Sequence, residues 1–462
     1  MLWQAQFGPF VIQVIGRGSL GVIMEDVPTV MLIIPSATYR AAEFLGAAAK
    51  LGVDVVTGSD APATLAANMD DRFIELELDR PDDAVAKIVL LDSRVPLDAV
   101  IGVDDQGLLV AAIASERLGL RSNPPSAVAI TRNKVAMRSV LATHEVCQPS
   151  FEVVDRGVEG VEGLDRHIAK AAQRLGYPCV AKPSNQAASR GVIRIDNDEQ
   201  AAMAAHRIEA LLASDNDHTS PLLVERFIAG VEIAIEGLLH EGELEVLAIF
   251  DKPDPLDGPF FEETIYVTPS SRDPVLLDAA ARLVGQACAA IGLVDGPVHA
   301  EVRLANDQAA PGGALPVLVE VAARTIGGRC SQVLSFSRGK SLEEIVIAHA
   351  LGLDKRNPRR LTLGASGVMM LPIASSGRLI AVDGCEEALA TEGITKIEIS
   401  IRVGTLVQAL PEGNRYLGFL FARGRRPADV EQALRRAHAK LDVQINHDPI
   451  AGSTGASAAE VA

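Results

Sequence analysis

The chain has 462 residues, 48% of them hydrophobic, so it is long enough for about two to four globular domains with cores of their own. Its 43 Lys and Arg residues against 60 Asp and Glu residues give a formal net charge of -17, which opposes binding to nucleic acid and to anionic lipid surfaces. The five scattered cysteines include no C-x-x-C pair, no apolar run approaches the roughly 20 residues of a membrane span, and no export signal is visible, so we predict a cytoplasmic protein with no membrane partner.

The opening stretch VIQVIGRGSLGVIM contains glycines at the spacing G-x-G-x-x-G, namely Gly16, Gly18 and Gly21. This fingerprint binds a dinucleotide where a helix begins directly after the glycines. The following VIMEDVPTV is too short for a helix before Pro28 and lacks helical apolar spacing. We therefore interpret residues 1–28 as a leader extension with a hairpin or irregular structure, and a dehydrogenase is the least favoured function.

Residues 29–130 alternate between strand and helix patterns. TVMLII and VDVVTG are typical of buried strands, and ATYRAAEFLGAAAKLG between them is predicted to be helical. Phe44, Leu45, Ala48 and Leu51 share one predicted helix face, and Gly52 is a suitable C-cap. The alternation predicts a small, mostly parallel open sheet, which ends near RSNPPS, where two prolines interrupt the pattern.

From Thr131 the pattern changes to a helix, TRNKVAMRSVLATHEV, followed by short strands and loops that predict a domain rich in antiparallel hairpins. We place this domain at residues 131–355. A small C-terminal domain follows at residues 356–447, with a predicted helix from Pro427 to Leu441. The tail, residues 448–462, is small and polar and is predicted to be disordered. The predicted fold class is therefore α/β and α+β, with several domains.

Four features occur in a fixed order in the middle domain. The first is a pair of lysines, Lys134 in TRNKVAMR and Lys182 at the end of the apolar strand in YPCVAKPS. The second is the loop SNQAASRGV, residues 184–192, whose small residues let backbone N–H groups approach an anion. The third is the stretch PLLVERFIAGVEIAIEG, and the fourth is the pair Glu301 in VHAEVRL and Glu320 in VLVEVAARTIGG.

Acidic residues alternate with apolar ones in the strands of the last two features. In VEIAIE, Glu232, Ala234 and Glu236 lie on the same strand face, so we expect the acids to point away from the core. Glu301 and Glu320 each end or interrupt an apolar strand, and ANDQAAPGGALP between these strands is typical of a hairpin loop. The two carboxylates could therefore meet on adjacent strands, where two hard oxygen ligands suit Mg²⁺.

Together and in this order, the features resemble the ATP-grasp superfamily, specifically its carboxylate-amine ligases of the L-amino-acid-ligase type. The resemblance covers nearly the whole chain after the leader, and implies a Rossmann-like N-terminal domain, a two-lobed ATP-grasp domain and a small lid-like C-terminal domain. It also implies ATP and Mg²⁺ (or Mn²⁺) as cofactors, a small-molecule carboxylate and an amine as substrates, and a homodimer.

The resemblance implies nucleotide-binding roles for both lysines and for the end of the loop. An ammonium group beside the triphosphate neutralises charge and holds the nucleotide in line for transfer. Glu225 would accept a hydrogen bond from the adenine amino group, the backbone near Phe227 would contact the ring edge, and Glu232 would bind the ribose hydroxyls. The implied cofactor-binding residues are Lys134, Lys182, Ser189, Arg190, Gly191, Glu225, Phe227 and Glu232.

The same resemblance makes Glu301 and Glu320 the metal ligands. A frequent third ligand of the family, Asn, is replaced here by Ala322, which weakens a second metal position or leaves it to water. Arg324 would hold a substrate carboxylate or the acyl phosphate, a task that suits a bidentate guanidinium, and together with Lys182 it is implied to be catalytic. The implied substrate-binding residues are Glu263 for an ammonium group, Arg303 for a carboxylate, Arg324, Gly327 and Gly328.

The implied reaction is the phosphorylation of a carboxylate, expected to belong to an amino acid, by ATP. An amine then attacks the acyl phosphate to form an amide or dipeptide, with release of ADP and phosphate. One alternative is a purine-pathway or biotin-carboxylase-like ATP-grasp enzyme that uses formate or bicarbonate. Another is a non-catalytic nucleotide-binding protein, an alternative motivated by Ala322 and by the small number of glycines in the loop.

Several residues also have a purely structural interpretation. Lys134 could be a solvated helix lysine, and the 184–192 loop an ordinary hairpin turn. Glu232 and its neighbours could form an exposed acidic strand face, and Arg303 could simply pair with an acid. His299 is interpreted as a packed or hydrogen-bonded histidine rather than a base.

Overall fold

The computed structural model describes residues 27–61, 72–156, 161–306, 313–353, 361–362 and 364–446. The leader glycines and the predicted disordered tail, residues 448–462, lie outside these described residues. The chain forms two compact units, the first within residues 1–121 and 343–355 and the second within residues 122–342 and 356–462. The domain boundaries drawn from the sequence stay predictions.

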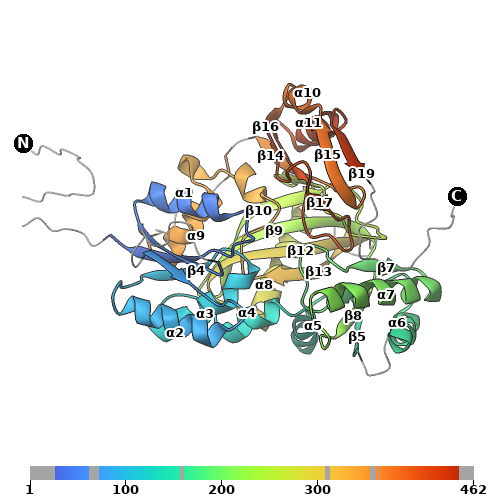
Figure 1. The fold of residues 1–462 in the computed structure, drawn as a ribbon, viewed down its shortest axis with the longest axis horizontal. Helices are drawn as coiled ribbons and strands as arrows, with labels where there is room; N and C mark the ends of the chain where they lie inside the picture. The colour runs from blue at the N-terminus through green and yellow to red at the C-terminus, as the bar shows by residue number, and fades with distance from the viewer. Residues whose placement is uncertain are drawn as a thin grey trace, which may run out of the picture. The chain divides into compact units, whose positions relative to one another are not determined.

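The first unit contains a four-stranded parallel sheet of order β3-β2-β1-β4 (Figure 1). Val30 and Leu32 of β1 pack with α1 and α9 on one face, and Met31 and Ile33 pack with α2 and α3 on the other. A parallel sheet covered on both faces confirms the predicted Rossmann-like fold. The elements are β1 (Thr29–Ile33), α1 (Ala41–Leu51), β2 (Asp54–Ser59), β3 (Phe73–Glu75), α2 (Pro81–Asp92), β4 (Ala99–Gly102), α3 (Asp105–Leu118) and α9 (Leu342–Ala350).

Helix α1 buries a narrower face than the sequence suggests. Phe44, Ala47 and Ala48 are buried, whereas Leu45 is 41% exposed. The prediction that Leu45 shares the buried face is wrong, because one step along a helix turns the side chain by about 100°. Gly52 ends the helix as predicted, with a φ of 67° that a residue without a Cβ adopts readily.

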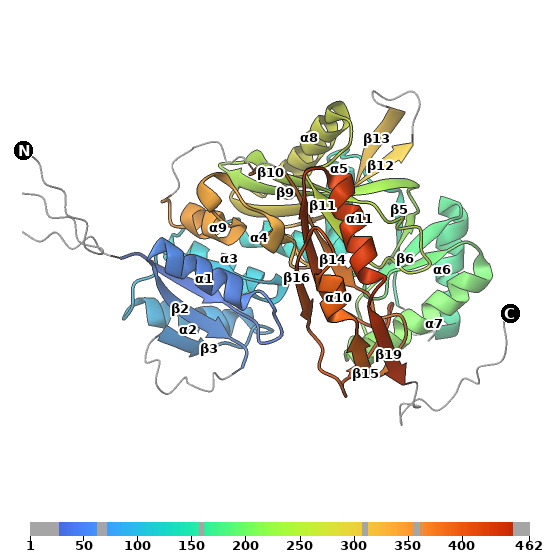
Figure 2. The same ribbon diagram turned by 90° about the horizontal axis from the view of Figure 1, so that it is seen from above.

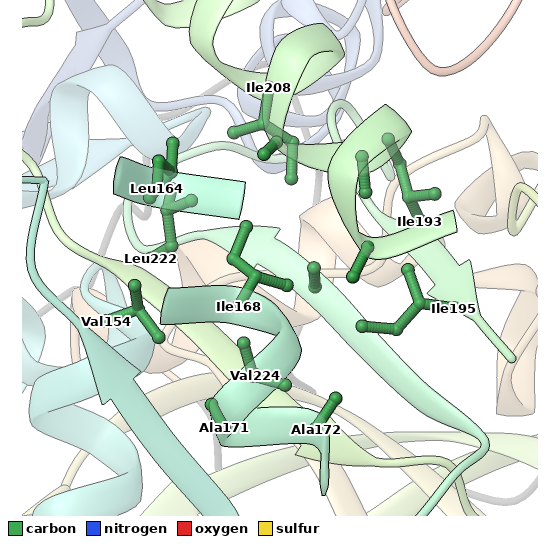
Figure 3. Close-up of a cluster of buried hydrophobic side chains, with 14 of the residues drawn as sticks. Val154, Leu164, Ile168, Ala171, Ala172, Ile193, Ile195, Ile208, Leu222 and Val224 are labelled. Carbon is green, nitrogen blue, oxygen red and sulfur yellow. The ribbon is translucent and has the colours of Figure 1, made fainter. Parts of the chain in front are cut away.

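The second unit begins with α4 (Pro125–Thr131) and α5 (Lys134–Thr143), followed by an antiparallel sheet of order β5-β8-β6-β7. Helices α6 and α7 supply side chains such as Leu164, Ile168 and Ile208 to a core that they share with Leu222 and Val224 of this sheet (Figure 3). The elements are β5 (Phe151–Val154), α6 (Val161–Leu175), β6 (Cys179–Pro183), β7 (Ile193–Ile195), α7 (Asp198–Ser214) and β8 (Leu222–Arg226).

The second unit also contains an eight-stranded antiparallel sheet of order β13-β12-β9-β10-β11-β14-β18-β16. Because β11 pairs with β14, this sheet continues from the middle of the chain into its C-terminal part. The strands from the middle of the chain are β9 (Gly230–His240), β10 (Glu243–Lys252), β11 (Ile265–Thr268), β12 (Gly296–Asn306) and β13 (Ala314–Ala322).

The C-terminal part adds three strands to this sheet and forms a second sheet of order β17-β15-β19, with α11 packed on β14 and β18 (Figure 2). The predicted helix from Pro427 to Leu441 is α11 (Pro427–His438), which ends slightly earlier than expected. The other elements are β14 (Ala365–Leu371), β15 (Gly377–Asp383), α10 (Cys385–Leu389), β16 (Ile394–Ile399), β17 (Leu406–Val407), β18 (Gly418–Gly424) and β19 (Asp442–Asn446).

Helix α8 (Pro274–Ile291) is, among the described residues, the one helix long and apolar enough to cross a membrane. Leu276, Ala280, Leu283 and Ala287 are buried and recur at helical spacing. This is the pattern of a helix that packs into a protein core, and such a helix can be as long and as apolar as one that crosses a membrane.

Candidate functional site

Helix α5 carries two buried cationic side chains one turn apart, Lys134 and Arg138. Asn133 caps the start of the helix with its side chain. Lys134 Nζ donates to Gln186 O of the predicted phosphate loop at 2.8 Å and to Glu320 Oε1 at 3.2 Å. Because Lys134 is only 8% exposed, the alternative of a solvated helix lysine is wrong.

Glu225 at the end of β8 lies between two buried cations. Its Oε2 is 2.7 Å from Lys182 Nζ of β6, and its Oε1 accepts from Arg138 Nε at 2.5 Å. Arg138 also donates to Val319 O of β13, directly before Glu320. Burial raises the pKa of Glu225, but the charges of Arg138 and Lys182 and their hydrogen bonds outweigh burial and lower it to about 2. The ionised carboxylate thus links α5, β6 and β8.

The predicted phosphate loop is held at its end by the C-terminal part of the chain. Gly191 N donates to Pro411 O at 2.9 Å, and Arg190 Nε donates to Glu412 O at 3.1 Å. Arg190 also forms an ion pair with Asp215. Its guanidinium is therefore engaged by protein groups.

The same loop is also a turn between antiparallel strands. It joins β6 to β7, which pair with each other. Ser189 and Ala188 adopt left-handed backbone conformations with φ of 55° and 54°. The hairpin interpretation therefore holds for the connection, and it is compatible with backbone N–H groups that bind phosphate.

Lys252, at the end of β10, lies at the centre of three carboxylates. Its Nζ is 2.6 Å from Glu232, 2.8 Å from Glu263 and 2.9 Å from Glu301, and it lies 4.9 Å from the ring centroid of Tyr266. Burial raises the pKa of Glu263 to about 6 although Lys252 opposes this, and the pKa of Lys252 itself is raised well above its ordinary value by the three acids despite its burial. Lys252 is therefore an ammonium group at neutral pH.

The acids of β9 do not point away from the core. Glu232 is 7% exposed and Glu236 is 0% exposed, whereas Val231, on the opposite strand face, is 40% exposed. Glu236 accepts from Ile326 N at 3.0 Å, and Arg303 Nε donates to Glu232 at 2.9 Å. The predicted exposed acidic face is wrong, because buried cationic and N–H groups compensate the buried carboxylates.

Arg303 of β12 is buried and engaged by several acceptors. Besides Glu232, it donates to Ile228 O and Gly230 O, and its guanidinium lies 5.2 Å from the ring centroid of Phe227. Its pairing with an acid matches the structural alternative drawn from the sequence. The guanidinium of another arginine, Arg194, lies 4.6 Å from the same Phe227 ring centroid.

Glu301 and Glu320 face each other as direct partners on β12 and β13. Burial raises the pKa of Glu301, but Lys252 and His299 hold it well below its ordinary value. His299 is buried, with Nε2 3.8 Å from Glu301 and Nδ1 3.5 Å from Glu236. Two ionisable carboxylates on neighbouring strands form the hard oxygen ligand set that suits Mg²⁺, so these residues fit such an ion.

The segment after β13 contains the other candidate substrate residues. Arg324 is half-buried and donates to Thr325 O at 3.0 Å. Gly328 has a φ of 58°, and a Cβ at this position would meet the Met370 side chain at 2.4 Å. Gly327 directly precedes it, and Ala322, which pairs with His299 at the end of β13, is buried.

Sequence reasoning missed Lys252 and Arg138. Arg138 follows Lys134 by four residues, so helical spacing predicts a shared face and could have indicated it. Lys252 follows the apolar run of residues 246–250 closely, much as Lys182 follows the apolar residues at the start of β6, which is a detectable signal. The three acids around Lys252 are far apart in the sequence, and they are brought together by the order of the strands and by the path of the segment before β11.

Three known sequence families match the chain. They are described as "ATP-grasp N-terminal domain" over residues 44–121, "ATP-grasp domain" over residues 175–333 and "L-amino acid ligase C-terminal domain 2" over residues 369–446. These matches follow one another along the chain in the same order as the N-terminal, ATP-grasp and C-terminal domains expected from the sequence. The resemblance drawn there is confirmed.

Individual proteins agree with these matches. The alanine–anticapsin ligase of Bacillus subtilis is 29% identical over 253 residues, which cover 50% of this chain and 51% of that protein. A D-alanine–D-alanine ligase of Geobacter sulfurreducens is 33% identical over 126 residues, which cover 27% of this chain and 35% of that protein. The match therefore spans about half the length, or less, of these curated relatives.

A solved structure matches over a longer range. The crystal structure of an L-amino acid ligase from Bacillus licheniformis matches with a TM-score of 0.75 and 25% identity, over 91% of this chain and 99% of that one. A carboxyaminoimidazole ribonucleotide synthase in complex with ATP shares the fold alone, with a TM-score of 0.67 and 15% identity over 90% of this chain and 99% of that one. The chain therefore belongs to the ATP-grasp superfamily, in the group that carries the L-amino acid ligase C-terminal domain.

Proposed function

We propose that the protein is an ATP-dependent carboxylate–amine ligase that joins an amino-acid carboxylate to an amine and releases ADP and phosphate. The observation that carries the proposal is the position of Lys134. Its ammonium contacts both the predicted phosphate loop, at Gln186 O, and the predicted metal ligand Glu320. The structural match to an L-amino acid ligase and the C-terminal domain of that group support an amino acid as the substrate class.

The proposed reaction has two steps. The carboxylate oxygen forms a bond to the γ-phosphorus as the bond between that phosphorus and the β,γ-bridging oxygen breaks, and ADP leaves. The amine nitrogen then forms a bond to the acyl carbon, the carbon–oxygen bond to phosphate breaks, and the amine proton passes to solvent. Such chemistry depends on positioning and charge neutralisation rather than on a nucleophilic side chain.

We propose the following division of roles. Lys134, Lys182 and the loop end at Ser189, Arg190 and Gly191 bind the phosphates. The N–H groups of Arg190 and Gly191 would exchange their present acceptors, Ala187 O and Pro411 O, for phosphate oxygens. Glu301 and Glu320 would hold Mg²⁺, which when bound neutralises phosphate charge. Arg324 holds the acyl phosphate or carboxylate, with the backbone of Gly327 and Gly328 close by, and Glu263 binds an ammonium group.

The adenosine contacts are also proposals. Both oxygens of Glu225 are already occupied by cations, and so are both oxygens of Glu232. A carboxylate oxygen has two acceptor positions, so a further hydrogen bond from adenine to Glu225, or from ribose to Glu232, is compatible with these ion pairs. The backbone near Phe227 would contact the adenine ring edge.

A phosphate-release assay tests the function. The protein is mixed with ATP, Mg²⁺ and pairs of amino acids, with formate and bicarbonate as separate additions, and phosphate is measured. We expect release only with suitable amino acids, and loss of release, by about a hundredfold or more, in Glu320→Gln, because a metal ligand and a partner of Lys134 are lost. Glu243→Gln, an exposed acid of β10, is the matched control.

Other results would point to the alternatives. Release with bicarbonate or formate alone would favour the purine-pathway or biotin-carboxylase-like enzyme. Tight ADP binding without release across the whole panel would favour a non-catalytic nucleotide-binding protein. A cytoplasmic location, a homodimer and the lack of nucleic-acid and membrane partners also stay proposals, and light scattering after size exclusion tests the dimer.

A further inference from the structure

Lys252 is almost completely enclosed, and it contacts acids from two strands of the sheet and from the segment before β11. Its side chain is 3% exposed, and its three closest carboxylates belong to Glu232 on β9, Glu263 before β11 and Glu301 on β12. Strand register explains the placement in part, because Lys252 is the direct partner of Glu232. An ammonium group has three N–H donors, and here each of them has its own acceptor.

The three carboxylates would repel one another without a cation between them. One oxygen of each lies within 4.8 Å of one oxygen of both others, a spacing at which a divalent ion could bind all three. Arg303 is a second cation, but it contacts only Glu232 within this set. The three acids therefore exceed these two cations by one negative charge, and removal of the ammonium would leave an excess of two.

The three acids have separate tasks in the proposed function: ribose binding for Glu232, ammonium binding for Glu263 and metal binding for Glu301. One side chain that holds all three fixes their relative positions. It also fills the space where their oxygens converge, so a divalent ion gains little there until a nucleotide supplies phosphate oxygens as further ligands.

We propose that Lys252 is a positioning residue that acts as a resident cation: it orders Glu232, Glu263 and Glu301 and keeps divalent ions away from Glu301 in the nucleotide-free protein. The inference uses the proposed function only for the metal role of Glu301. Lys252 itself contacts protein groups and takes no part in bond formation.

Binding of Mn²⁺ to the nucleotide-free full chain tests this role, measured by electron paramagnetic resonance and calorimetry. We expect weak binding by the wild type and binding of one Mn²⁺ on the order of tenfold or more tighter by Lys252→Met, because a unit positive charge in contact with the acids is lost. Lys252→Arg restores a cation and should bind weakly again. The added mutation Glu301→Gln should abolish the new site in Lys252→Met.

The matched control is Lys396→Met. Lys396 also forms an ion pair, with Glu398 at 3.0 Å, but its side chain is 49% exposed and it lies on β16. This variant loses the same charge and should bind Mn²⁺ as the wild type does. If it gains the same affinity as Lys252→Met, net charge rather than the local site explains the effect and the proposal is overturned.

Two further results would overturn the proposal. One is a wild type that binds Mn²⁺ as tightly as Lys252→Met without nucleotide. The other is a folded Lys252→Met protein, with unchanged circular dichroism, that gains no Mn²⁺ affinity. If Lys252→Met does not fold, Lys252→Gln, which keeps polar contacts without the charge, is measured in its place under the same criteria. The assay contains neither ATP nor amino acids, so its outcome is independent of the ligase assay.

Discussion

Glu225 connects the buried cations of the site with the pH dependence of stability. Its pKa is lowered from an ordinary value of 4.5 to about 2 in the folded chain, because Arg138 and Lys182 outweigh the effect of burial. The unfolded chain therefore binds a proton at higher pH than the folded chain. The stability contributed by this group is fully present above pH 4.5 and is lost as the pH falls toward 2.

We predict that the Glu225→Gln variant is less stable than the wild type at pH 6 and loses less further stability between pH 6 and pH 3. The amide cannot ionise and leaves two buried cations without their anion, which costs on the order of 3–5 kcal/mol at neutral pH. Urea unfolding at several pH values measures both effects. Glu243→Gln, at an exposed position of β10, is the control, and parallel pH curves for wild type and Glu225→Gln would contradict the assignment.

A comparison of alanine substitutions at Gly328 and Gly339 distinguishes the cost of backbone strain from the cost of a steric clash. Both have positive φ, 58° and 72°, but a Cβ on Gly328 would lie 2.4 Å from Met370 Sδ, and a Cβ on Gly339 would meet nothing within 4 Å. We predict that Gly339→Ala costs on the order of 1 kcal/mol, and that Gly328→Ala costs about 1–3 kcal/mol more, since Met370 must move. Urea unfolding of both variants checks this, and equal costs would show that the Met370 side chain yields freely.

At the scale of elements, the predicted phosphate loop depends on a segment far away in the sequence. Glu412 forms a two-pronged ion pair with Arg207 of α7, at 2.8 and 2.9 Å, while its backbone oxygen accepts from Arg190. The neighbouring Pro411 O accepts from Gly191 N. The ion pair thus holds the segment that accepts the hydrogen bonds of the loop.

We predict that Glu412→Gln speeds hydrogen exchange at the amide of Gly191 severalfold, while the free energy of unfolding changes by less than about 1 kcal/mol, because the ion pair is exposed. Hydrogen exchange of the folded protein, measured by mass spectrometry on the proteolytic peptide that contains the loop, checks this prediction. Glu431→Gln removes a comparable surface pair with Arg435, at 2.9 Å on α11, and should leave loop exchange unchanged. Equal exchange in both variants would mean that the loop is held without Glu412.

Element patterns explain which parts of the site were predictable. The strand-and-hairpin pattern around Glu301 and Glu320 predicted adjacent strands, and the two residues are direct partners. The alternation of acidic and apolar residues correctly predicted the strand β9, but it wrongly predicted that Glu232 points away from the core. Alternation shows which residues share a face, and it does not show that the neighbouring strands place the cations Lys252 and Arg303 directly beside Glu232. The prediction that Leu45 is buried is wrong for a similar reason. The width of the buried face of α1 depends on what packs against this helix, which the local sequence pattern does not show.

At the scale of the whole molecule, the order of the motifs was more informative than any single motif. Lys134, Lys182 and the paired acids indicated the superfamily from the sequence, and the comparisons confirm it. The convergence on Lys252 could not be predicted in this way. Glu232 and Glu301 meet there because β9 pairs with both β10 and β12, and Glu263 reaches the same place from the segment before β11, which pairs with β10. Such long-range pairing is not encoded in local periodicity.

The division into two compact units has a thermodynamic consequence. All proposed nucleotide ligands belong to the second unit, from Lys134 to Glu320, and the first unit has its own core around β1. A ligand stabilises the folding unit that binds it, by about 2.7 kcal/mol at a hundred times its dissociation constant. We predict that calorimetry shows two transitions, and that ADP with Mg²⁺ raises the midpoint of one only.

The variant Lys182→Met identifies which transition belongs to the nucleotide. It should remove most of the shift, because the ammonium proposed to contact the phosphates is lost, while Lys87→Met, at a lysine of the first unit that pairs with Glu77 at the surface, should leave the shift intact. If both transitions rise together with ADP in the wild type, the first unit is energetically coupled to nucleotide binding, and its fold must then be counted as part of the ATP site.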